Sequence, residues 1–102
     1  MPTREVSTVL RVEVPPSVKS HEPFAITVHT LSGGKTMPDR VEVRVTGLRA
    51  EIIPYDIIEQ SSALRAGVAM DSPRSVSLQF DTPGIATIRV VDRESQVVVR
   101  PP

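Results

Sequence analysis

Apolar and polar residues alternate along much of this chain with a period of two residues. The clearest stretch runs from Val76 to Asp92, where the alternation continues on both sides of Asp81-Thr82-Pro83-Gly84. Two-residue periodicity interrupted by a Pro-Gly break is typical of two half-buried strands joined by a tight turn. We therefore expect a β-hairpin made of residues 76–80 and 85–91.

The same alternation predicts three strands in the first half of the chain, at residues 6–14, 24–30 and 41–46. The first is expected to place Leu10 on its core-facing side and to end at Pro15-Pro16, because proline has no N–H to donate to a ladder. The second should be central in its sheet, with His29 on the solvent-facing side. The third ends at Gly47 and is expected to bury Val43. The segments between them, residues 18–23 and 32–39, are predicted as loops.

Residues 48–75 allow two interpretations. A short strand is expected at Arg49–Ile53. Pro54 either ends this strand or confines it to the edge of a sheet. From Asp56 to Ala66 the residues suit either a helix capped by its first residue, or an irregular crossover followed by a strand from Leu64 to Met70. The strand interpretation is favoured because the rest of the chain is β.

The last strand is expected at Gln96–Arg100, after a polar turn at Asp92–Ser95. Ten prolines and five glycines punctuate the chain, and only three aromatic residues are present, so the core must be rich in Val and Ile. Branched side chains of this kind pack well on a pleated sheet. About seven short strands with regular turns indicate an all-β Greek-key sandwich, formed by residues 1–102 as a single domain.

The residues around the Pro-Gly break resemble one strand of immunoglobulin-like domains. Their sixth strand often opens with Asp-x-Gly-x-Tyr-x-Cys, and Asp81, Gly84, Ala86 and Ile88 form a looser version of it. Ala86 stands where the tyrosine would be, and Ile88 where the cysteine would be. The chain is thus similar to the cysteine-free Ig-like domains of bacterial and phage surface proteins. This resemblance implies an Ig-like Greek-key β-sandwich.

Charge and cysteine content narrow the possible functions. The 12 basic and 12 acidic residues cancel, so no charge excess favours nucleic acid or an anionic membrane. A chain without net charge also lacks the repulsion that keeps copies apart. No cysteine is present for a disulfide, a thiolate metal site or a nucleophile. The apolar run near the N-terminus is charged and too short for a signal sequence or a membrane span. We expect a cytosolic start or a virion, or an extracellular location if the domain is excised.

The sequence predicts no catalytic, cofactor or metal site. His21 and His29 do not have the spacing of a zinc site, and we expect both rings to be solvated. No serine lies in a Gly-x-Ser-x-Gly elbow, and Gly33-Gly34-Lys35-Thr36 lacks the strand-to-helix context of a phosphate loop. The chain is therefore predicted not to be an enzyme.

Two stretches contain more consecutive apolar residues than one face of a strand can bury. The interface candidates in the first stretch are Ile52, Ile53, Tyr55, Ile57 and Ile58. In the second, Val98 is expected on an edge strand able to pair with another chain. Apolar residues left at a surface mark protein interfaces. The alternative for the first stretch is a strand buried on both faces, or a loop that closes one end of the sandwich.

We therefore expect a structural, protein-interaction domain that works within a larger assembly, such as a virion decoration or tail component of a phage. Its partner would be a protein, either a second copy or a capsid or tail subunit, and it would be oligomeric in the assembly. Neither nucleic-acid binding nor membrane insertion is predicted. Two alternatives stay open: a spacer or adhesin module of a secreted bacterial protein, and an Ig-like carrier or accessory subunit of an enzyme complex.

Overall fold

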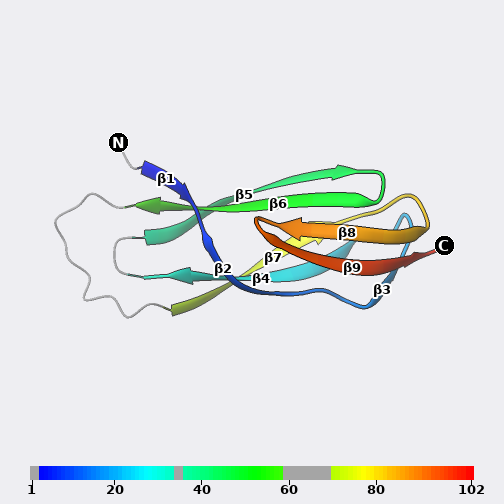
Figure 1. The fold of residues 1–102 in the computed structure, drawn as a ribbon, viewed down its shortest axis with the longest axis horizontal. Coiled ribbons are helices and arrows are strands. Elements are labelled where there is room, and N and C mark those ends of the chain that lie inside the picture. Colours follow the sequence, from blue (N-terminus) through cyan, green and yellow to red (C-terminus); the bar gives the residue numbers. More distant parts are fainter. Residues whose placement is uncertain (1–2, 34–35, 59–69) are drawn as a thin grey trace.

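The computed structural model describes residues 3–33, 36–58 and 70–102, which form nine strands and no helix (Figure 1). The strands are β1 (Thr3–Val6), β2 (Thr8–Glu13), β3 (Ser17–Lys19), β4 (Phe24–Ser32), β5 (Thr36–Thr46), β6 (Arg49–Ile58), β7 (Met70–Leu78), β8 (Gly84–Val90) and β9 (Arg93–Arg100). They form two sheets that enclose one core, so the protein is an all-β sandwich, as the sequence predicts.

Sheet A has the order β1-β6-β8-β9-β3, and sheet B has the order β2-β4-β7. β4 is therefore central in its sheet, as expected. In sheet A, β8 pairs with residues 49–52 of β6 and β1 pairs with residues 55–58. β5 pairs with β6 along almost its whole length. Because a strand has two edges, β1 and β8 must share one edge of β6, and β5 occupies the other.

The first predicted strand, residues 6–14, consists of two strands in different sheets. β1 pairs with β6 and β2 pairs with β4, so the chain passes from sheet A to sheet B at Ser7. The register of β2 shifts between Val9 and Arg11, and Leu10 is 38% exposed instead of facing the core. A β-bulge of this kind reverses the expected side of a residue, and alternation alone does not reveal it.

The prediction that residues 76–80 and 85–91 form a hairpin is wrong. β7 belongs to sheet B and β8 to sheet A, so residues 79–83 connect the two sheets. The alternation itself is confirmed, because its apolar members are all buried: Val76, Leu78, Phe80, Ala86, Ile88 and Val90. The period of a strand indicates which side is buried, but it does not indicate which strand lies beside it.

The two hairpins of the described chain lie elsewhere. β5 and β6 are joined by Gly47-Leu48, and β8 and β9 by Val91-Asp92. Gly47 ends β5 as predicted and has a φ of 56°, while Val91 has a φ of 58°. That backbone conformation suits glycine and is strained for a β-branched residue. Because β9 begins directly after this turn, most of the polar turn predicted at residues 92–95 is strand.

Pro54 lies inside β6 instead of ending it, and the strand continues to Ile58. The backbone carbonyls of Ile52 and Pro54 accept hydrogen bonds from Val91 and Ser7, so this side of β6 faces β8 and β1. Pro54 falls between the segments paired with those two strands, where its missing N–H breaks no ladder bond. The alternative of a helix beginning at Asp56 is wrong for residues 56–58. The remainder of that helix, and the predicted strand before Met70, lie outside the described residues.

The core is aliphatic apart from Phe80, which stacks on Phe24 with ring centroids 5.9 Å apart. Ile88 is fully buried, as predicted. Val43 is 43% exposed, which contradicts its predicted burial. It lies in sheet A, like Ile88, on the edge strand β5. Two predicted loops also contain strand residues: β3 occupies part of 18–23, and β4 and β5 extend into 32–39.

Candidate functional site

The predicted interface residues of β6 divide between its two sides. Ile52 is fully buried, and Pro54 and Asp56 are buried beside it on the side that faces sheet B. Ile53, Tyr55 and Ile57 alternate with them and are therefore on the solvent-facing side of sheet A, where each is partly exposed. Ile58 is partly buried on the inner side at the end of the strand. The alternative of a strand buried on both faces is therefore wrong, because only the inner side of β6 is buried.

Neighbouring strands add two apolar residues to this outer side. The register places Val6 of β1 beside Tyr55 and Met37 of β5 beside Ile57, and these two are 47% and 38% exposed. Directly opposed residues of paired strands project to the same side of a sheet. We call this group the outer apolar cluster: Val6, Met37, Ile53, Tyr55 and Ile57. The sequence pattern did not indicate Val6 or Met37, because their place depends on the register.

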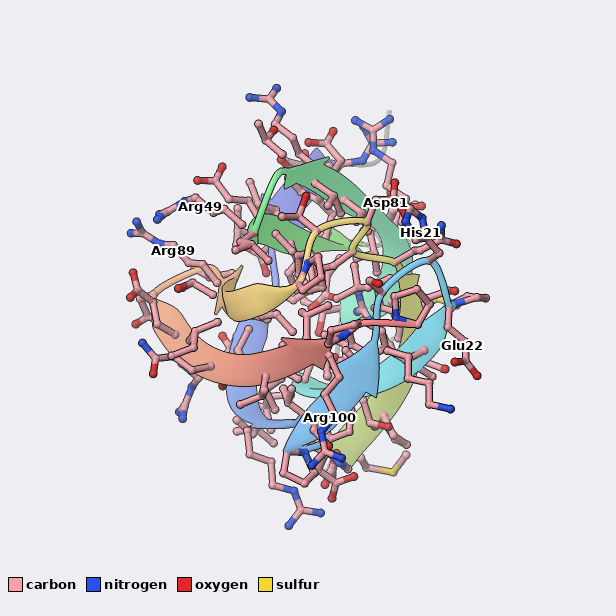
Figure 2. The ribbon with its side chains drawn as sticks, turned by 90° about the vertical axis from the view of Figure 1, so that its right-hand side faces the viewer. His21, Glu22, Arg49, Asp81, Arg89 and Arg100 are labelled. Carbon is pink, nitrogen blue, oxygen red and sulfur yellow. The ribbon has the colours of Figure 1, made fainter. Side chains whose placement is uncertain are left out.

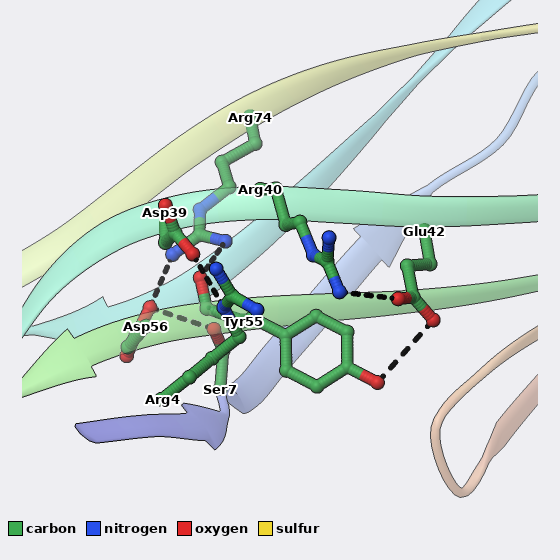
Figure 3. Close-up of polar contacts among 8 residues, drawn as sticks. All are labelled: Arg4, Ser7, Asp39, Arg40, Glu42, Tyr55, Asp56 and Arg74. Atoms are coloured by element: carbon green, nitrogen blue, oxygen red, sulfur yellow. Dashed lines mark hydrogen bonds and ion pairs between the residues drawn. The ribbon is translucent and has the colours of Figure 1, made fainter. Parts of the chain in front are cut away.

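Charged residues lie next to the outer apolar cluster, and Figure 3 shows those near Tyr55. The Nε of Arg4 donates to Asp39 at 2.8 Å, and Arg40 donates to Glu42 at 2.8 Å. The Arg40 guanidinium also lies 5.7 Å from the centre of the Tyr55 ring, whose hydroxyl donates to Glu42 at 3.4 Å. The hydrogen bond from Arg4 is the main reason that the pKa of Asp39 lies below its usual value. An aromatic and apolar centre with a charged rim is the usual anatomy of a protein interface.

A buried polar group lies on the opposite side of the same strand. Asp56 accepts hydrogen bonds from Arg74 of β7 and, at 2.7 Å, from the hydroxyl of Ser7 (Figure 3). A second nitrogen of Arg74 donates to the backbone oxygen of Tyr55 at 3.1 Å. The side chains of Arg74 and Asp56 are only 9% and 3% exposed. This group links the two sheets and fixes the backbone that carries Tyr55.

Two shallow grooves lie on either side of Ile53. One, of about 320 Å³, is lined by Val6, Glu51, Ile52, Ile53, Arg89 and Val91. The other, of about 350 Å³, is lined by Glu42, Val43, Arg44, Glu51 and Ile53. Both mix apolar and charged residues and open to solvent, which suits contact with side chains of another protein.

The second predicted contact, at Val98, has a different setting. Its side chain is 47% exposed and lies beside Ile85, which is 64% exposed. Its backbone N–H is already used, because it donates to the oxygen of Pro16 at 3.2 Å where β3 pairs with β9. Val98 is therefore not on the free edge that the sequence suggested, and Val97 and Val99 are buried.

The two histidines lie apart and contact different carboxylates. His29 is buried, which corrects the expectation of a solvated ring: its Nδ1 lies 2.9 Å from Asp71, and its Nε2 lies 3.4 Å from Glu13. His21, seen beside Asp81 in Figure 2, lies 3.2 Å from that carboxylate. Among the described residues no group of three or more His, Cys, Asp or Glu side chains could hold a metal ion. The described part of the chain also contains no helix long and apolar enough to cross a membrane.

Comparisons with known protein families, with curated proteins and with solved structures found no match to this chain.

Proposed function

We propose that this protein is a non-enzymatic interaction domain that contacts another protein through the outer apolar cluster, within a larger assembly. The observation that carries the proposal is the position of Ile53, Tyr55 and Ile57 on the solvent-facing side of a strand whose other side is fully occupied by the core. Their burial there by a partner would remove apolar surface from water at about 25 cal/mol per Å².

The surroundings of the cluster support the same proposal. The backbone oxygen of Tyr55 accepts a hydrogen bond from the buried Arg74 on the inner side of the sheet. On the outer side, its ring lies near the Arg40 guanidinium and its hydroxyl donates to Glu42. A tyrosine fixed before binding loses little conformational entropy when a partner covers it, and this is one reason why tyrosine is enriched at interface centres.

We further propose that the sandwich is of the Ig-like kind and that the assembly is a phage virion, in which the domain serves as a decoration or tail component. The order β2-β4-β7 of sheet B is compatible with the A-B-E order of Ig-like domains. The parallel pairing of β6 with β8 departs from their antiparallel second sheet. The proposal of a virion rests on the resemblance of residues 81–88 to the cysteine-free Ig-like domains of bacterial and phage surface proteins.

The test compares two substitutions that each place a carboxylate on a partly exposed apolar residue of sheet A. Ile57→Asp changes the outer apolar cluster, and Val98→Asp changes the exposed residue of β9. Tagged variants are expressed in the native host, and the co-purifying proteins are quantified by mass spectrometry. We expect Ile57→Asp to lose the parent's partners by about tenfold or more, because a buried charge must be desolvated. Val98→Asp should retain them.

Tyr55→Asp is a second variant of the same cluster and should behave like Ile57→Asp. Circular dichroism shows whether each variant keeps the β-sandwich. If both cluster variants are folded and still capture the parent's partners, the outer apolar cluster is not the interface.

A further inference from the structure

Among the described residues, no strand pairs with the outer edge of β5 along residues 41–46. In the described chain β5 pairs with β6 alone, and the right-hand half of β5 forms the upper rim of the ribbon in Figure 1. Ile52 and Pro54 direct their carbonyls toward β8 and β1. The residues that alternate with them, Glu51 and Ile53, therefore direct their backbone groups toward β5, where they pair with Arg44 and Glu42.

It follows that the N–H and C=O groups of Val41, Val43 and Val45 point away from β6, since these groups change side at every residue along a strand. The two-residue turn gives the same result, because the residues that flank it, Thr46 and Arg49, form a hydrogen-bonded pair. A row of outward donors and acceptors is a template for another strand.

The side chains of this edge are apolar on one side of the sheet. Val43 and Val45 lie beside Ile52 and Ala50, which are fully buried, yet these valines are 43% and 40% exposed. Proteins usually protect such an edge with proline, a bulge or inward-pointing charge. β5 has Pro38 and a register shift between Pro38 and Val41. The stretch from Val41 to Thr46 contains no proline, no register shift and no charge on the inner side.

We propose that this edge pairs with the same edge of a second copy, antiparallel and centred on Val43. The stretch reads Val-Glu-Val-Arg-Val from residue 41 to 45 and is self-complementary in that register. Val43 lies opposite Val43, each Val41 lies opposite a Val45, and each Glu42 lies opposite an Arg44 of the other copy. Opposite charges and β-branched pairs directly across two strands are both favourable.

Two neighbouring registers would also bring the outward-facing valines opposite one another, but both are unfavourable. Centring on Glu42 places that carboxylate opposite itself and Arg40 opposite Arg44, while centring on Arg44 places that guanidinium opposite itself. Like charges directly opposed across two strands are destabilising. Charge therefore selects the register centred on Val43, and the hydrogen-bonding groups of the three valines then face each other in the two copies.

The resulting interface has twofold symmetry, so it closes at a dimer and leaves no further β5 edge for a third copy. Sheet A becomes continuous across the two copies, and the two outer apolar clusters lie on the same side of it. This inference names a second copy as one partner of the proposed interaction domain. It rests on the edge residues 41–45 and not on the outer apolar cluster, so the two proposals can fail separately.

Two charge reversals and their mixture test the inference by sedimentation equilibrium over a range of concentrations. The parent should show the mass of a dimer. Glu42→Arg alone puts arginine opposite arginine, and Arg44→Glu alone puts glutamate opposite glutamate, so each should weaken the dimer on the order of tenfold or more. An equimolar mixture of the two variants restores both opposite-charge pairs and should form a heterodimer. Arg93→Glu, an exposed charge reversal on β9, which pairs with neither β5 nor β6, should leave the dimer unchanged.

A parent that stays monomeric at the highest soluble concentration would overturn the inference. So would variants that dimerise like the parent, or a mixture that stays monomeric while circular dichroism shows both variants folded. Ile57→Asp keeps the edge intact and should still dimerise, which separates this result from the test of the outer apolar cluster.

Discussion

Asp56 of β6 and Arg74 of β7 form a buried ion pair that joins the two sheets of the sandwich. Ser7, at the point where the chain passes between the same two sheets, donates a hydrogen bond to the same carboxylate oxygen. The pair thus lies where three segments that are distant in sequence come together. It stabilises the fold only if all three are in place.

Removing one member of the pair should be costly. Arg74→Ala leaves the Asp56 carboxylate buried without its counter-charge, and we expect the free energy of unfolding to fall by about 3–5 kcal/mol. The double variant Asp56→Leu/Arg74→Met removes both charges and should recover most of that loss, because an apolar pair needs no compensation. Urea unfolding of the three proteins measures this. A double variant as unstable as Arg74→Ala would show that the loss comes from packing and not from charge.

The core prediction has a matched control on the same sheet. Ile88→Ala should lower the free energy of unfolding by about 2–5 kcal/mol, because the side chain is fully buried. Val43→Ala removes methyl groups from a side chain that is 43% exposed, and it should cost less than about 1 kcal/mol. Both are measured by denaturant unfolding on dilute protein. Equal losses would contradict the arrangement of the core described above.

Val91 has a strained backbone, and its side chain packs against the core. Its φ of 58° is unfavourable for a β-branched side chain, and strain of this kind costs roughly 1–3 kcal/mol. Val91→Gly relieves the strain, but it makes the unfolded chain more flexible and removes methyl groups that pack against the core. We therefore expect the free energy of unfolding to change by less than about 1 kcal/mol.

Gly47→Ala is the reverse control for Val91→Gly. Gly47 is the first residue of the β5–β6 turn, as Val91 is of the β8–β9 turn. It has a φ of 56°, and nothing lies within 4 Å of an added Cβ. Backbone strain alone should then cost about 1–2 kcal/mol. Thermal unfolding of both variants, compared at the parent's midpoint, is the measurement. A loss in Val91→Gly as large as that in Gly47→Ala would mean that the Val91 side chain contributes more by packing than its backbone costs.

The contact between Arg4 and Asp39 predicts a pH dependence. Because the hydrogen bond from Arg4 lowers the pKa of Asp39, the contact is fully present above the carboxyl's usual pKa and is lost as the pH falls through the lowered value. Arg4→Gln should raise the pKa of Asp39 toward that usual value. Carbon-13 NMR titration of the side-chain carboxyl measures the shift. An unchanged titration curve would show that Arg4 does not hold this carboxylate in solution.

The sequence predicts the fold class and most buried positions, because alternation depends only on which side of a strand meets the core. It does not predict strand pairing. Nothing in the pattern around Ser7 marks the change of sheet, and nothing in residues 79–83 distinguishes a crossover from a tight turn. The predicted burial of Val43 is wrong for a related reason: Val43 lies on an edge strand of sheet A, and alternation does not indicate which strand lies at an edge.

The candidate site, too, is predicted from the sequence only where it does not depend on strand pairing. Ile53, Tyr55 and Ile57 could be chosen from the run of apolar residues in the sequence. Val6 and Met37 could not, because they join the cluster only through cross-strand register. The ion pair between Asp56 and Arg74 is also invisible in the sequence. A carboxylate within a strand pattern is ordinarily taken to face water, and only the position of β7 shows its partner.

The arrangement of strand neighbours also bears on how fast this protein acquires its structure. In the described chain only the hairpins β5–β6 and β8–β9 join strands that follow one another directly; every other pairing closes a longer loop. Hairpins form in about 1–10 μs, whereas sheets dominated by distant pairings assemble in milliseconds to seconds. We expect the two hairpins to form early and β1 to dock last. Substitutions in β1 should then accelerate unfolding and leave the refolding rate nearly unchanged.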